Sequence, residues 1–191
     1  MIFTSLPLEG LHLIAPEPVA DERGFFARTW CRREFEQHGL DVFEAQRSMS
    51  YNAKAGTLRG MHYQIEPHGE NKLVGCARGA IFDVAVDLRP GSPTFGQHAS
   101  VVLSAANHHS LYIPKGFAHG FQTLEDDTEV TYALSAFYRP GAASGIRWND
   151  PELNIAWPRD VSVISERDAQ LPLLRDVSRA DFNSTQFEGS S

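Results

Sequence analysis

The sequence contains few cysteines and no long apolar run, and these two shortages exclude several classes of protein. Cys31 and Cys76 are the only cysteines among 191 residues, so neither a disulfide framework nor a structural zinc site is indicated. The chain starts Met-Ile-Phe-Thr without the basic and apolar segments of a signal peptide, and no stretch of about 18 apolar residues follows. We therefore expect a soluble protein of the reducing cytoplasm that does not contact a membrane.

Positive charge is also scarce. The 17 Lys and Arg residues are outnumbered by 24 Asp and Glu residues, which gives a formal charge of −7. Because nucleic-acid binding depends on neutralising phosphates with Lys and Arg, no general affinity for nucleic acid is expected. Any anionic ligand must therefore be bound by a local basic cluster. The length and the 42% hydrophobic content suit one domain, placed at residues 1–177, with a polar tail at 178–191.

Short β-type segments dominate the chain from residue 43 onward. Clusters of Gly, Pro, Asn or Asp separate them, and such regular spacing is typical of a sandwich or barrel rather than of βαβ units. The expected strands are 43–52, 58–64, 72–77, 81–88, 99–103, 110–113, 117–123 and 129–137. Residues 2–28 predict two short strands with Arg23 at a turn, and residues 32–38 predict one short helix ended by Gly39.

The segment 81–88 shows the clearest two-residue alternation. Phe82, Val84, Val86 and Leu88 fall on one face, and the other face carries Ile81, Asp83, Ala85 and Asp87. Carboxylates on an otherwise apolar strand suit the interior of a barrel that holds a polar ligand. Solvated positions at a sheet edge are the alternative explanation for both aspartates.

The stretch from Gly56 to Gln64 combines a guanidinium, an imidazole and a phenol. Arg59 and His62 point to opposite faces of a regular strand, so a twist or bulge at Gly60 is needed to bring both toward one pocket. Arginine binds phosphate or carboxylate in a bidentate manner, and histidine titrates near neutral pH, which together suggest anion binding with proton transfer. A surface arginine and a hydrogen-bonded core histidine are the alternative on these residues alone.

The run Pro-Lys-Gly-Phe-Ala-His at residues 114–119 resembles the second half-motif of the cupin jelly roll. In metal-dependent cupins the first half-motif supplies a His-x-His pair and a glutamate, whereas the matching region here reads His62-Tyr63-Gln64. Two usual ligands are missing, and an open catalytic site needs about three protein ligands. We therefore expect neither a metal nor another cofactor.

Further motifs follow in one consistent order between about Asp21 and Asp168. They comprise residues 56–64, 72–74, 82–87, 91–96, 113–121, Tyr132, 138–140 and 145–151. Together they resemble the dTDP-4-dehydrorhamnose 3,5-epimerase family. The resemblance implies an all-β, cupin-type jelly-roll barrel with a few short helices and an irregular C-terminal cap. It also implies a metal-free homodimer that exchanges protons at C3 and C5 of a nucleotide-linked 4-keto-6-deoxyhexose on the route to dTDP-L-rhamnose.

The resemblance assigns roles to individual residues. His62 would be the base, with Asp168 orienting its imidazole and Asp83 as a rival partner; Tyr132 would be the acid across the ring, and Lys72 would lie near the developing enolate. Imidazole, with an ordinary pKa of about 6.5, accepts a proton at neutral pH, and a phenol near 10 can protonate an enolate carbon. Substrate contacts would come from Arg23, Phe26, Gln46, Ser48, Arg59, Lys72, His119, Tyr138 and Arg167. Taken singly, Lys72 and the tyrosines are equally compatible with ordinary strand surface and core.

Three positions depart from the family pattern. Arg28 and Ser48 replace a common glutamate and asparagine, and residues 141–144 lack an expected acidic side chain. All three belong to the nucleotide-binding side of the site. They therefore leave open the nucleoside that carries the sugar, which could be thymidine, uridine, cytidine or guanosine. A polar site can discriminate strongly against a ligand that leaves a donor or acceptor unpaired.

Several functions remain open at this point. A C3-only epimerase or a 3,4-ketoisomerase would use nearly the same residues. A non-catalytic sugar-nucleotide-binding cupin and a metal-dependent cupin isomerase or dioxygenase are rivals from other classes. For the homodimer, the apolar segment Leu11–Ile14 is a candidate for strand exchange across a two-fold axis.

Overall fold

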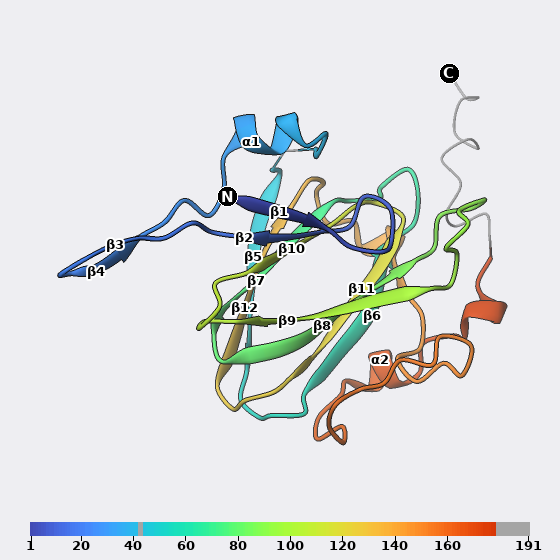
Figure 1. Ribbon diagram of the computed structural model, residues 1–191. Coiled ribbons are helices and arrows are strands. Elements are labelled where there is room, and N and C mark those ends of the chain that lie inside the picture. Colours follow the sequence, from blue (N-terminus) through green and yellow to red (C-terminus); the bar gives the residue numbers. More distant parts are fainter. Residues whose placement is uncertain (42–43, 179–191) are drawn as a thin grey trace.

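Two antiparallel sheets form the body of the protein (Figure 1). The computed structural model describes residues 1–41 and 44–178. In spatial order, the first sheet contains β1 (Ile2–Ser5), β2 (His12–Ala15), β10 (Ser110–Ile113), β7 (Lys72–Arg78), β12 (Thr128–Leu134) and β5 (Gln46–Asn52). The second contains β13 (Ala143–Gly145), β6 (Leu58–Gln64), β11 (Phe117–Thr123), β8 (Ala80–Asp87) and β9 (His98–Ser104). The all-β jelly-roll prediction is confirmed.

The remaining elements are short. Strands β3 (Val19–Asp21) and β4 (Gly24–Phe26) form a hairpin of their own. The helices are α1 (Arg32–Gln37), α2 (Glu166–Ala169), and the 3-10 turns η1 (Pro140–Ala142) and η2 (Leu174–Asp176). Within the described ranges no helix is long and apolar enough to span a membrane.

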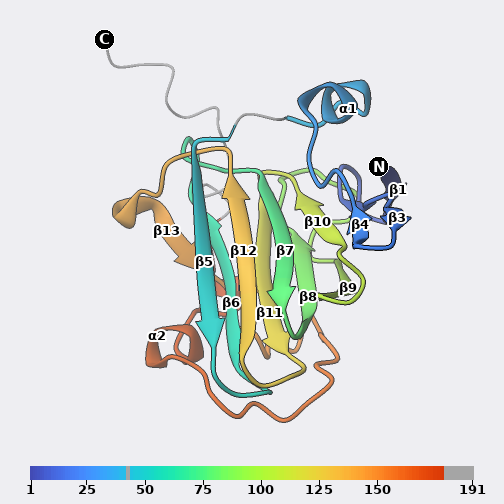
Figure 2. The ribbon, with the colours of Figure 1, turned by 90° about the vertical axis from the view of Figure 1, so that its left-hand side faces the viewer.

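The sheets face each other and enclose the main apolar core (Figure 2). Alternate residues of each strand point inward, as the two-residue period of a strand requires. Val74 and Val130 come from the first sheet, and Ile81, Ala85 and Phe121 from the second. Because these strands arrive from distant parts of the chain, the core fixes the two sheets relative to each other.

Strand β8 carries different cores on its two faces. Ile81 and Ala85 join the core between the sheets, whereas Val84 packs in a second cluster with Ile146 and Leu153 of the C-terminal segment. That segment therefore covers the outer face of the second sheet and is the predicted irregular cap. Asp83 and Asp87 are both 0% exposed, so the alternative that placed them at a solvated edge is wrong.

Asp87 organises the loop after β8. Its carboxylate accepts hydrogen bonds from the guanidinium of Arg89 and from the hydroxyls of Ser92 and Thr94. Burial by itself raises the pKa of the Asp87 carboxyl, but these donors outweigh burial and lower the pKa from 3.8 to about 2. A group with a depressed folded-state pKa stabilises the protein above its unfolded pKa and loses that contribution as the pH falls.

We predict that Asp87→Asn lowers the free energy of unfolding by roughly 2 kcal/mol at pH 7, the value that corresponds to the pKa shift. The difference should shrink between pH 4 and pH 2, where wild-type Asp87 itself becomes protonated. Urea unfolding at pH 7 and near pH 3 measures both values. An equal loss at the two pH values would assign the effect to packing and contradict the electrostatic explanation.

Several boundaries differ from the sequence-based expectation. The N-terminal 28 residues contain four strands rather than two, although Arg23 does lie at a turn. The last predicted strand ends at Leu134 rather than Phe137, and Ser135 beyond it exchanges hydrogen bonds with the backbone of Asn71. The helix at residues 32–38 is confirmed as α1. Phe43, predicted to open a strand, and residues 179–191 of the predicted tail lie outside the described residues.

Candidate active site

An irregularity at Gly60 shapes the strand that carries His62. Gly60 has a φ of +120°, and a Cβ atom there would lie 2.6 Å from the Cα atom of Gly120 on β11. The β6–β11 register shifts at this point, between the partners of His119 and Phe121. Only glycine tolerates this combination of conformation and close approach. The predicted irregularity at Gly60 is therefore confirmed.

His62 is held by a carboxylate from the C-terminal cap. Its Nε2 atom lies 2.8 Å from Oδ1 of Asp168, which is 5% exposed on α2. The other carboxylate oxygen accepts the backbone N–H of Gly60 at 3.0 Å, and Ser165 caps the helix by accepting the N–H of Asp168. Burial opposes ionisation, but the hydrogen bond from His62 and its charge hold the pKa of Asp168 below its usual range. In a neutral imidazole this contact places the proton on Nε2, toward Asp168, and leaves Nδ1 as the nitrogen that accepts a proton.

The rival partner, Asp83, binds a different histidine. Its Oδ1 atom lies 2.7 Å from Nε2 of His119, whose backbone lies directly opposite His62 in the β6–β11 ladder. Within the described ranges, Oδ2 of Asp83 is a buried side-chain atom without a hydrogen-bond partner. The geometry assigns Asp168 to His62 and Asp83 to His119.

Tyr132 approaches the same interior from the other sheet. Its ring packs edge-on against His119, with centroids 6.3 Å apart, and its hydroxyl shares a 3.1 Å hydrogen bond with Ser50. Burial, reinforced by the negative charge of Asp83, raises the pKa of Tyr132 to about 12. The phenol therefore keeps its proton throughout the neutral range.

Lys72 is buried beside the histidine strand. Its ammonium donates to the main-chain oxygen of His62 at 3.2 Å and lies 3.5 Å from a carboxylate oxygen of Glu70. Both side chains of this ion pair are 9% exposed. Burial lowers the pKa of Lys72, and Glu70 opposes that shift. A cation of this kind can stabilise negative charge on a bound oxygen.

Of these groups, His62, Lys72 and Glu70 border a cavity of about 120 Å³, whereas Tyr132 is not among the residues that line it. It is lined by His62, Tyr63, Gln64, Glu70, Lys72, Tyr138, Ala143, Ser144 and Arg167. Two cations and a histidine in one cavity can bind an anionic ligand and move a proton. Among residues 1–41 and 44–178, no group of three His, Cys, Asp or Glu side chains is arranged to hold a metal ion.

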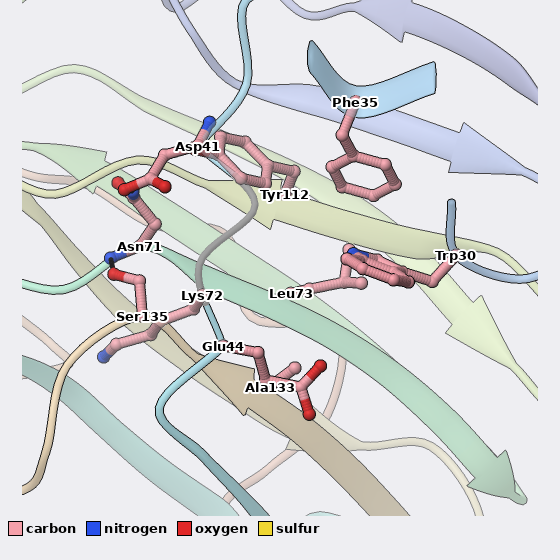
Figure 3. Close-up of a pocket in the computed structure, with 10 residues that line it drawn as sticks. All are labelled: Trp30, Phe35, Asp41, Glu44, Asn71, Lys72, Leu73, Tyr112, Ala133 and Ser135. Atoms are coloured by element: carbon pink, nitrogen blue, oxygen red, sulfur yellow. Dashed lines mark hydrogen bonds between the residues drawn. The ribbon is translucent and has the colours of Figure 1, made fainter. Parts of the chain in front are cut away.

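A smaller cavity of about 20 Å³ beneath α1 is separate from this one, although Lys72 contributes to both (Figure 3). In Figure 3 the side chain of Lys72 points away from the rings of Trp30, Phe35 and Tyr112. Because the ammonium donates to His62, it belongs to the larger cavity.

The other predicted substrate contacts lie at varying distances from this centre. Arg59 does not line the cavity but donates to Asn52 at 2.7 Å and lies close enough to Tyr132 to influence its pKa. Gln46 accepts the backbone N–H of Tyr138 at 3.1 Å, and Ser48 pairs with Tyr132 across the β5–β12 ladder.

Arg23 and Phe26 are not brought to the site by their own chain. Both lie on the β3–β4 hairpin, which projects from the sheets on the side opposite α2 in both ribbon views (Figures 1 and 2). The Arg23 side chain is 84% exposed and pairs with Asp21, and Phe26 is 79% exposed.

Sequence reasoning missed four polar residues that line the cavity, Tyr63, Gln64, Glu70 and Ser144. Gln64 is the last residue of the motif at 56–64 that carries the family resemblance, but no function was predicted for it. Glu70 precedes Lys72 by two residues, and an acidic residue so close to a candidate buried lysine is the signal that could have identified it.

Comparison with known proteins places the chain among enzymes of one type. The family described as dTDP-4-dehydrorhamnose 3,5-epimerase matches residues 5–176. The enzyme of that name from Sinorhizobium fredii is 43% identical over 178 residues, which cover 93% of this chain and 91% of the relative. The one from Pseudomonas aeruginosa is 45% identical, over 87% and 92% of the two chains.

Solved structures agree with this assignment. A Bacillus anthracis dTDP-4-dehydrorhamnose 3,5-epimerase with TDP and PPi bound superimposes with a TM-score of 0.88 at 42% identity, over 91% of this chain and 99% of the other. A Legionella pneumophila dTDP-6-deoxy-D-glucose-3,5-epimerase in complex with dTDP-4-keto-L-rhamnose gives 0.87 at 38% identity, over 93% and 94%. The chain therefore belongs to the dTDP-4-dehydrorhamnose 3,5-epimerase family.

Proposed function

We propose that the protein epimerises C3 and C5 of a dTDP-linked 4-keto-6-deoxyhexose, in the sense that converts dTDP-4-dehydro-6-deoxyglucose to dTDP-4-dehydrorhamnose. The observation that carries the proposal is the placement of a carboxylate-oriented histidine, His62, and a buried neutral phenol, Tyr132, on facing sheets. A base and an acid on opposite sides of a sugar ring are what inversion at a carbon requires.

The proposed chemistry uses protons only. Nδ1 of His62 removes the proton from a carbon next to the C4 ketone, and the electron pair moves to the ketone oxygen to form an enolate. The Lys72 ammonium stabilises that oxygen, and the Tyr132 hydroxyl then returns a proton to the same carbon from the other face. His62 then releases the abstracted proton to solvent and Tyr132 regains one from solvent, so no oxidant, metal or other cofactor enters the balance.

The proposal is tested by supplying the dTDP-linked ketosugar and following the product sugar by proton NMR. Turnover with the dTDP carrier, and slower turnover with UDP, CDP or GDP carriers, supports the proposed substrate. Binding of the dTDP sugar without product would favour a binding module. Activity that disappears on treatment with a chelator and returns with metal would favour a metal-dependent cupin.

We also propose that the protein works as a homodimer in the cytoplasm, with residues 1–177 as one domain. Both edges of β2 are paired within its own chain, with β1 and β10. For the dimer contact we therefore propose the β3–β4 hairpin in place of strand exchange through Leu11–Ile14. A second copy that receives this hairpin would gain Arg23 and Phe26, which the chain leaves exposed. Cys31 and Cys76 are free thiols, which suits a reducing compartment.

This dimer makes a prediction about mixed subunits. Arg23→Ala and His62→Asn are each expected to be nearly inactive as pure proteins. When the two are unfolded together and refolded, up to about a quarter of the sites would combine an intact hairpin with an intact His62 and regain activity. Light scattering checks that the mixture contains dimers. Mixed dimers as inactive as the parents, or a monomeric protein, would contradict the proposed arrangement.

A further inference from the structure

Glu70 is a buried carboxylate with no role in the reaction described so far. It lies in the loop between β6 and β7, and its side chain is 9% exposed. One oxygen accepts a hydrogen bond from Nε2 of Gln64 at 3.0 Å, and the other lies 3.5 Å from Nζ of Lys72. A carboxylate withdrawn from water to this extent is costly unless its charge is paired, so the ion pair with Lys72 needs an explanation.

The orientation of Glu70 is fixed from behind. The Gln64 carboxamide accepts the backbone N–H of Arg139 at 2.8 Å, and its NH2 group also donates to the main-chain oxygen of His68 at 3.0 Å. These contacts determine which end of the amide is oxygen and direct an N–H toward Glu70. The carboxylate is therefore held in place by a neutral donor, and its negative charge is left for Lys72.

Lys72 has one more donor than these contacts use. An ammonium has three N–H groups; one is directed to the main-chain oxygen of His62 and one toward Glu70. The third can reach a ligand in the cavity that Lys72 and His62 both line. Glu70 and the main-chain oxygen of His62 thus fix the orientation of the Lys72 ammonium and direct its third N–H into the cavity.

The charge of Lys72 also depends on this neighbour. Burial lowers the pKa of Lys72, and the largest opposing influence is Glu70, followed by Asp83. A neutral amine would attract an enolate oxygen far less than an ammonium does. The titratable and charged groups that surround Lys72 are Glu70 before β7, His62 on β6 with its partner Asp168, Asp83 on β8, Tyr138 and Arg167 in the cavity wall, and Asp41, Glu44 and Tyr112 in the smaller cavity on its other side.

We propose that Glu70 is a positioning residue for the epimerisation: it keeps the buried Lys72 ammonium charged and directs the remaining N–H beside His62, at the oxygen where negative charge develops. The inference rests on the proposed function, because it assumes that Lys72 acts on that oxygen. Glu70 would affect the reaction only through Lys72 and would not contact the sugar.

The direct test is a pH titration of the lysine side chains by 13C and 15N NMR. The sequence has three lysines, at positions 54, 72 and 115, so the signals can be assigned by single substitutions, and Lys54 and Lys115 serve as internal references. In Glu70→Gln the amide oxygen can still accept from Gln64, whereas the charge is lost. The midpoint for Lys72 is expected to fall by about 1–2 pH units. An unchanged midpoint overturns the proposal.

Kinetics give the functional readout and the controls. The alkaline limb of the pH profile of kcat should move to lower pH in Glu70→Gln, by the same amount as the Lys72 midpoint. At a pH above the midpoints of both proteins, each pH unit of this shift corresponds to about tenfold lower kcat in the variant. Glu66→Gln, a matched change in the same loop with no contact to Lys72, should move neither quantity. Glu70→Asp retains the negative charge, so its Lys72 midpoint and its kcat should both lie closer to wild type than to Glu70→Gln. A kcat loss in Glu70→Gln that is the same at every pH would indicate a structural role and overturn the proposal.

The outcome separates this inference from the proposed function. If Lys72→Met keeps wild-type turnover, the role proposed for Lys72 fails, and that of Glu70 fails with it. If Lys72→Met is inactive while Glu70→Gln shifts neither the Lys72 midpoint nor the alkaline limb, only the inference about Glu70 fails. Thermal unfolding of each variant confirms that folded protein is compared.

Discussion

Substitution of His62 by asparagine is expected to lower kcat by roughly 10³-fold, which is within the range for the loss of a positioned general base. Asparagine can still donate an amide N–H to Asp168, so the cap and the strand should remain in place. It cannot accept a proton at the position of Nδ1. Turnover of the dTDP ketosugar measures the loss, and calorimetry with dTDP should give a Kd within about threefold of wild type, because binding and proton transfer are separate.

A matched histidine substitution provides the control. His68→Asn changes an exposed side chain in the loop after β6, and it should retain wild-type kcat and KM. If His62→Asn keeps more than about a tenth of wild-type turnover, His62 is not the base. Equal losses in the two variants would indicate that the strand and loop had been disturbed.

The second large effect is expected for Tyr132→Phe. The phenyl ring fills the same space beside His119 and removes the hydroxyl that bonds Ser50. Formation of the epimer should slow by about 10²–10³-fold. His62 should still remove a proton and return it, or a solvent deuteron, to the face it came from. The variant should therefore exchange substrate protons faster than it inverts the carbon, unlike His62→Asn, which should do neither.

Proton NMR in D₂O measures exchange and inversion in the same sample. The control is Tyr51→Phe, an exposed tyrosine on β5 that bonds Asp127, and it should behave as wild type. If Tyr132→Phe and His62→Asn lose exchange to the same extent, Tyr132 does not act as a separate acid. If Tyr132→Phe inverts the carbon at the wild-type rate, another group donates the proton.

Local patterns were sufficient to predict the strands that carry the site. The alternation of residues in 81–88 favoured a buried Asp83 facing a polar ligand, although it left a solvated edge position open until the structure showed the burial. Gly60 was identifiable because a regular strand would have separated Arg59 from His62. Even so, Arg59 does not line the cavity that His62 lines, and only the structure shows that Arg59 lies close enough to Tyr132 to influence its pKa.

Local patterns in the sequence could not pair the carboxylates with the histidines; only the family resemblance implied that Asp168 orients His62, with Asp83 as a rival. Asp168 is 106 residues from His62 and reaches it because the cap packs its apolar residues on the outer face of the second sheet. Asp83 meets His119 through the β8–β11 ladder, whose register is set by the whole strand rather than by either residue. Both depend on contacts between distant segments, which a single sequence does not specify.

The hairpin that carries Arg23 and Phe26 shows another limit of local reasoning. Its turn at Arg23 is predictable from the sequence, but its projection away from the sheets is a property of the folded chain. Residues that match a binding motif can therefore lie far from the cavity of their own chain.

The most direct test of the account is a proton NMR time course in D₂O with dTDP-4-keto-6-deoxyglucose generated in place, comparing wild type with His62→Asn. Wild type is expected to lose both the C3 and C5 proton signals as deuterium enters, and His62→Asn is expected to lose neither. Exchange at C3 alone would indicate a 3-epimerase or a ketoisomerase. Absence of exchange at both carbons in wild-type protein that binds dTDP would contradict the epimerase assignment itself.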